Sequence, residues 1–183
     1  QVKVKIMEET HDISELYLED HNCISGPSRV QVSGIPDDGI HPIMSVRGET
    51  LTQHNARLVL RQEFPNLLID QRFTVDSLSI RWNIELINKS GNTVSPSVTV
   101  SLPFNHLLSQ YFCPTTEGPT LINKRTRKMY MYRSSTDVPL FTLYDSTHDI
   151  GVSLIPALEL HKSELSFALN QGNLIISFNN MAL

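Results

Sequence analysis

The segment from Pro103 to Pro119 combines residue types that could bind a polar ligand. Asn105 and His106 supply hydrogen-bonding groups, and Tyr111 and Phe112 add two flat aromatic rings. The apolar C–H face of a sugar suits a flat ring, and small-molecule sites combine such surfaces with a few polar groups. Long loops in compact domains are often functional. We therefore interpret Asn105, His106, Tyr111 and Phe112 as candidate ligand contacts. The alternative is that the two rings close one end of the hydrophobic core.

Other recognisable chemistries are absent from the sequence. The seven histidines form no HxH, HxxH or HExxH pair that would place two imidazoles on one metal ion. Cys23 and Cys113 have no CxxC spacing, and the chain contains no GxSxG, GxxxxGK or GxGxxG motif. The sequence therefore predicts no metal, no cofactor and no identifiable catalytic residue.

The carboxylates show no pair with an evident catalytic role. Asp145 and Asp149 bracket the segment DSTHD, where Asp and Ser side chains typically shape a turn through their own backbone. Glu63, Asp70 and Glu85 fall on the polar positions of predicted strands. They could line a groove, although charge facing solvent is the usual explanation.

Composition indicates one soluble domain and excludes several partners. The chain has 183 residues, 40% of them apolar and 19% charged, with a formal net charge of −4. A surface for nucleic acid needs clustered positive charge, whereas the one basic run along the sequence is Lys124, Arg125, Arg127 and Lys128, which we interpret as solvated surface. No apolar run is long enough for a membrane-spanning helix.

Strict alternation of apolar and polar residues predicts the elements that must position these groups. Between Ser77 and Asn88 every second residue is apolar and includes Trp82, so we expect this strand to be half-buried with Trp82 in the core. Similar strands at 57–64, 67–75 and 94–102 extend the pattern into a predicted four-stranded antiparallel meander. No segment has a helical period. About ten to fourteen strands with little or no helix predict an all-β antiparallel β-sandwich, with residues 1–183 as one domain.

Two longer passages resemble a known family. The run LSIRWNIELINKSGNTVSPSVTVSLPF and the later VPLFTLYDSTHDIGVSLIP, followed by two strands and NNMAL, resemble galactose-mutarotase-like β-supersandwiches. Such domains also occur at the N-termini of many glycoside hydrolases. The resemblance covers roughly residues 57 to 183 and rests on strands and turns, not on catalytic motifs.

The resemblance implies a non-catalytic domain that supports the catalytic module of a carbohydrate-active enzyme and contributes to sugar binding. Asn105 and His106 lie where mutarotases carry an Asn-His pair, although Leu107 replaces the aromatic residue that follows it there. The chain begins at Gln1 without methionine, so we expect a piece of a longer protein whose catalytic domain is its partner. Two alternatives stay open: a stand-alone sugar-binding or epimerising protein using His106 and Glu63 as acid and base, and a structural or adhesion sandwich that binds another protein.

Overall fold

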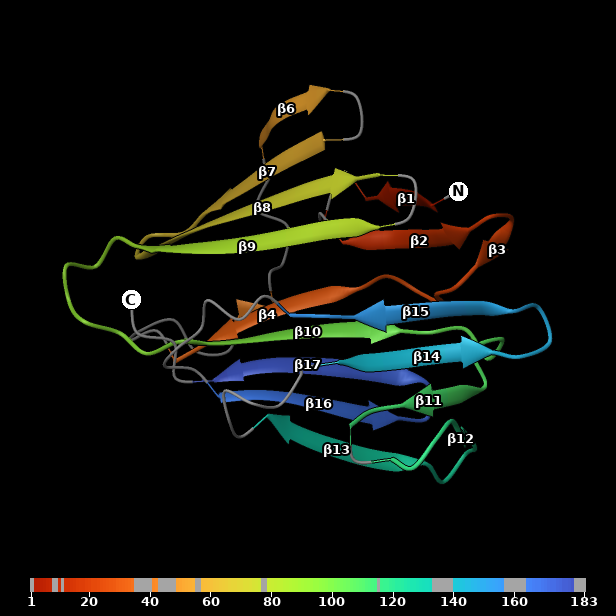
Figure 1. The fold of residues 1–183 in the computed structure, drawn as a ribbon. Coiled ribbons are helices and arrows are strands. Elements are labelled where there is room, and N and C mark those ends of the chain that lie inside the picture. The colour runs from red at the N-terminus through yellow and green to blue at the C-terminus, as the bar shows by residue number, and fades with distance from the viewer. Residues whose placement is uncertain are drawn as a thin grey trace.

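The computed structural model describes residues 2–7, 10, 12–34, 41–42, 49–54, 57–76, 79–114, 116–132, 140–156 and 164–179. Within these ranges every regular element is a β-strand, and the strands pair antiparallel in four sheets (Figure 1). The all-β, sandwich-like fold predicted from the sequence is therefore confirmed. None of the described segments forms a helix capable of crossing a membrane.

The strands, in chain order, are β1 (Val2–Ile6), β2 (Ile13–Leu18), β3 (His21–Asn22), β4 (Arg29–Ser33), β5 (His41–Pro42), β6 (Glu49–His54), β7 (Arg57–Glu63), β8 (Leu67–Val75), β9 (Ile80–Asn88), β10 (Ser97–Pro103), β11 (Gln110–Phe112), β12 (Thr120–Leu121), β13 (Arg127–Tyr132), β14 (Phe141–Asp145), β15 (Ile150–Leu154), β16 (Glu164–Asn170) and β17 (Asn173–Asn179). Of these seventeen, β3, β5, β11 and β12 have only two or three residues. The described residues thus form more strands than the ten to fourteen predicted, because these four short strands carry too little sequence pattern to predict.

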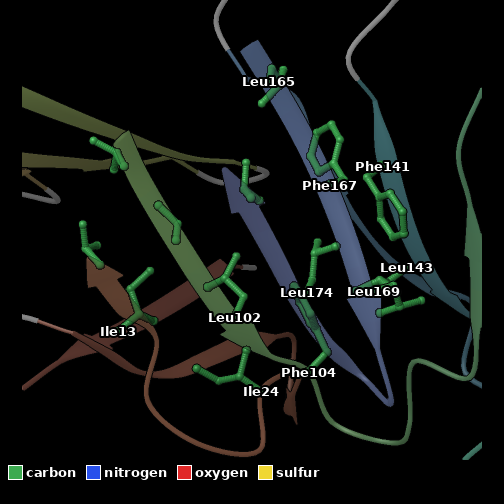
Figure 2. Close-up of a cluster of buried hydrophobic side chains, with 14 of the residues drawn as sticks. Ile13, Ile24, Leu102, Phe104, Phe141, Leu143, Leu165, Phe167, Leu169 and Leu174 are labelled. Carbon is green, nitrogen blue, oxygen red and sulfur yellow. The ribbon is translucent and has the colours of Figure 1, made fainter. Parts of the chain in front are cut away.

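The largest sheet has six strands in the order β13-β16-β17-β10-β4-β5. One of its faces packs against the four-stranded sheet β12-β11-β14-β15, as the neighbouring rings of Phe167 on β16 and Phe141 on β14 show (Figure 2). Their ring centroids are 5.6 Å apart, and both side chains are fully buried. Strands that alternate apolar and polar residues give a sheet with one apolar face. Packing two such faces together buries both, which is why these sheets form a sandwich.

A second four-stranded sheet has the order β6-β7-β8-β9. Its inward face contributes Phe73 and Ile69 to the core, and Trp82 packs partly buried against that core. The Trp82 ring stacks on Phe73 at 5.2 Å, and its Nε1 donates a hydrogen bond to Oε1 of Gln71 at 3.0 Å. The predicted core position of Trp82 is confirmed, whereas Leu78 at the start of the same pattern lies outside the described residues.

The predicted meander is wrong at its fourth strand. β10 does not pair with β9 but lies between β17 and β4 in the six-stranded sheet. The connection from Lys89 to Pro96 is too long to impose a tight hairpin. The inward side chains of β10 instead lie beside apolar residues of β4 and β17. Val100, for example, is flanked by Val30 on β4 and Ile176 on β17. Pro96 precedes β10 and so occupies no position in its ladder.

Candidate functional site

The predicted loop from residue 103 to 119 contains strand β11, which pairs with β14 on one side and β12 on the other. Tyr111 on β11 is only 8% exposed, and its ring stacks on Phe141 with centroids 5.9 Å apart. Phe112, the next residue of the strand, is half-buried. The Tyr111 ring thus belongs to the core, as the alternative interpretation of the two aromatic residues expected, and Phe112 retains partial access to solvent.

Asn105 fixes the turn that precedes β11. Its backbone N–H donates to the carbonyl of Cys23 at 2.8 Å, and its Oδ1 accepts a hydrogen bond from the N–H of Leu107 at 3.3 Å. The turn is therefore attached to the segment that follows β3, and its side-chain amide helps to hold the backbone. His106 lies in this turn with an exposed side chain.

The turn between β14 and β15 holds a carboxylate–imidazole pair. Asp145 Oδ2 lies 2.5 Å from Nδ1 of His148, and its Oδ1 accepts the backbone N–H of Thr147 at 2.9 Å. The hydrogen bond from His148, followed by that from Thr147, lowers the pKa of Asp145. Asp145 is 4% exposed, whereas the His148 side chain is 41% exposed. Because a carboxylate only accepts hydrogen bonds, Nδ1 carries the hydrogen, and in the neutral ring Nε2 is the free acceptor.

A second imidazole stands against this pair. The rings of His21, on β3, and His148 have centroids 4.8 Å apart and planes inclined by 47°. Nδ1 of His21 is buried and has no hydrogen-bond partner within the described residues. This arrangement brings together residues that are distant in the sequence, so no local motif could have predicted it.

We call the group His21, Asn105, His106, Asp145 and His148 the histidine end. β3, the β10–β11 connection and the β14–β15 turn all lie at the same end of the molecule, on the right in Figure 1. A hydrogen bond of 3.2 Å from Gln110 Nε2 to Ser146 Oγ joins β11 directly to the β14–β15 turn. The sequence correctly predicted that DSTHD forms a turn but missed its role in orienting His148, for which the Asp-x-x-His spacing was the available signal.

The described residues of the histidine end offer hydrogen-bonding groups and two imidazole rings to a ligand. No three described His, Cys, Asp or Glu residues are placed to hold a metal ion. Of the nearby nucleophile types, the Cys23 thiol donates to the carbonyl of His21 at 3.6 Å and the Ser146 hydroxyl is engaged by Gln110. Glu63 ends β7 and pairs with Lys89, and the β7–β8 turn lies opposite the β10–β11 connection (Figure 1). The structure therefore does not bring Glu63 to His106 as an acid–base pair.

Comparison with known proteins adds information about the fold alone. No protein family matches the sequence, and no curated protein is significantly similar to it. The crystal structure of the Slr1438 protein from Synechocystis sp. PCC 6803 matches with a TM-score of 0.62 at 12% sequence identity, covering 97% of this chain and 81% of that chain. The two chains therefore share a fold, and the resemblance to galactose-mutarotase-like domains stays a prediction.

Proposed function

We propose that this chain is a non-catalytic β-sandwich domain of a carbohydrate-active enzyme and that it binds sugar at the histidine end. The observation that carries the proposal is the Asp145–His148 pair, which holds one imidazole beside the ring of His21, with its Nε2 unpartnered among the residues that the structure describes. A sugar presents vicinal hydroxyl groups, each able to donate and accept hydrogen bonds. Fixed acceptors and donors next to flat rings are the groups that recognise such a ligand.

The position of Asn105 and His106 supports the same end of the sandwich. The hydrogen bond from Asn105 to the Cys23 carbonyl places this turn next to β3, which carries His21. Asn105 and His106, which the family resemblance associates with sugar binding, thus lie next to the imidazole pair of His21 and His148. The resemblance itself made no prediction about His21 or His148.

The proposal is tested by titrating the chain with a panel of mono- and oligosaccharides at about 10 mM, where a site of about millimolar Kd is well occupied. Binding is read from the thermal shift, because a ligand of the native state raises its Tm, and from the imidazole NMR signals. The matched variant is His148→Asn, whose amide Nδ2 can still donate to Asp145 but which removes the imidazole ring and the acceptor at the position of Nε2. His106→Ala tests the adjoining turn.

We expect His148→Asn and His106→Ala to weaken sugar binding. The control Ser153→Ala, on β15 of the sheet β12-β11-β14-β15, should leave sugar binding unchanged. Ser153 is hydrogen-bonded to Thr142 at 2.9 Å and lies outside the histidine end. Binding that survives in His148→Asn would place the sugar elsewhere. If no sugar shifts the Tm, the protein-binding sandwich is the surviving interpretation, and the exposed Met129 (62%) and Met131 (40%) on β13 favour it.

A further inference from the structure

The sheet β6-β7-β8-β9 carries four arginines on its outward face. Register pairs Arg57 with Thr74 and Thr74 with Arg81, so these three residues form one row across β7, β8 and β9. Adjacent strands lie about 4.8 Å apart, which puts the two arginine Cα atoms about 10 Å apart with Thr74 between them. All three side chains are exposed. The two guanidinium groups can therefore reach the same small ligand above the threonine hydroxyl.

The other two arginines of this face are already engaged. Arg61 donates two hydrogen bonds of 2.7 Å from Nε and Nη2 to the carboxylate of Asp70. Arg72 pairs with Glu85 at 2.7 Å and lies 3.8 Å from Asp70. Neither the Arg57 nor the Arg81 side chain has a hydrogen bond or ion pair in the described part of the chain. One face thus contains two paired and two unpaired guanidinium groups.

The carboxylates near the unpaired arginines are occupied. Asp70 and Glu85 are neutralised by Arg61 and Arg72, and the hydrogen bonds from Arg61 lower the pKa of Asp70, so this ion pair persists at neutral pH. Asp76 follows β8, and its two oxygens accept from the backbone N–H and the hydroxyl of Ser79, each at 2.7 Å. Because these donors are neutral, Asp76 keeps its negative charge, and Arg57 and Arg81 together exceed it by one positive charge next to Thr74, in a chain whose formal net charge is −4.

We propose that Arg57, Thr74 and Arg81 form a binding site for a tetrahedral oxyanion, namely the sulfate or phosphate group of a small molecule. Guanidinium groups donate paired hydrogen bonds to such oxygens, and a threonine hydroxyl adds one more donor. The site lies on a different sheet from the histidine end and does not depend on sugar binding there. A sulfated or phosphorylated sugar and the free inorganic ion share this chemistry.

The test uses the whole chain and titrates it with inorganic sulfate and phosphate while sodium chloride holds the ionic strength constant. Glucose 6-sulfate and glucose 6-phosphate, each compared with glucose, show whether the sugar adds to recognition of the anion. Binding is followed by calorimetry and by the arginine Nε–H NMR signals. Arg57→Gln and Arg81→Gln remove one charge each, and both side chains are exposed and make no hydrogen bond or ion pair with another side chain in the described part of the chain, so the fold tolerates their loss.

We expect each substitution to weaken anion binding by about tenfold or more, the factor typical of losing one charge-assisted hydrogen bond. The matched control is Arg127→Gln, an exposed arginine at the start of β13, which changes net charge equally and should leave binding unchanged. Equal weakening by all three substitutions would show a general charge effect and overturn the proposal. Failure of every sulfate and phosphate probe to bind at about 50 mM would also overturn it, whatever happens at the histidine end.

Discussion

Replacing Gln62 with methionine should stabilise this protein. Gln62 is 1% exposed on the inward face of β7, and neither Nε2 nor Oε1 of its side chain has a hydrogen-bond partner among the described residues. Its neighbours are apolar: Leu60 lies two residues earlier on the same face, and Ile69 is its register partner on β8. Burying an amide without hydrogen bonds is unfavourable, and methionine has a similar length and shape without that polar group.

The expected gain follows from the cost of the unsatisfied amide. That cost is about 1–3 kcal/mol in protein substitution data, and replacing a buried polar group by an apolar one of similar shape recovers it. For a chain of this size, each kcal/mol corresponds to roughly 2–4 °C in Tm. Gln62→Met should therefore raise the free energy of unfolding by about 1–3 kcal/mol and the Tm by several degrees.

Gln71 supplies a matched control on the adjacent strand. It is 2% exposed on the same inward face, but its Oε1 accepts the hydrogen bond from Trp82. Gln71→Met leaves the indole N–H without an acceptor and should lower stability by about 1 kcal/mol. Urea denaturation of the two variants and the parent chain, followed by Trp82 fluorescence, measures both changes. A loss of stability in Gln62→Met as large as in Gln71→Met would refute the reasoning, because it would show that the Gln62 amide has a partner such as a buried water.

Four further substitutions test the core, the histidine end and two turns. Phe167→Ala should lower the free energy of unfolding by about 3–5 kcal/mol, because this fully buried ring leaves a large cavity; a loss below about 1 kcal/mol would be inconsistent with its position. Asp145→Asn should make the protein less stable than the parent at neutral pH. Because the folded pKa of Asp145 is lowered, its contribution is complete above the unfolded value near 4 and disappears as pH falls below that, so the two acid-denaturation curves should converge there. Gly34→Ala should cost about 1–2 kcal/mol, since φ is +83° and the new Cβ would lie 3.1 Å from the Ser95 carbonyl oxygen. Gly91→Ala, at φ +74° with open space around it, should cost less, and a reversed order in thermal melts would contradict the steric argument.

Local pattern predicted the strands well and their partners less well. Alternation correctly placed Trp82 towards the core and identified β7, β8 and β9 as consecutive pairs. The same method assigned β10 to the wrong sheet, because alternation reports which face is apolar and not which distant face will cover it. Strand β11 was missed inside a predicted loop, since three residues are too few to show a period.

The candidate site was predicted only in part. Asn105 and His106 were chosen from the sequence and lie next to the imidazole pair of the histidine end, while Tyr111 proved to be a core residue. His21 and His148 could not be paired from the sequence, because their contact depends on how β3 meets the β14–β15 turn.

The sequence by itself determined the all-β class and the inward or outward direction of most strand residues. These follow from a period of two residues, which each strand sets locally. Only the tertiary structure decided which residues stand side by side: the row Arg57, Thr74 and Arg81, and the contact between His21 and His148. The physical reason is that register and sheet partners are selected by the fit of apolar faces from distant segments, after loops have closed between them. The same pairing of strands decides which polar side chains become neighbours. No local spacing in the sequence therefore predicts these groups.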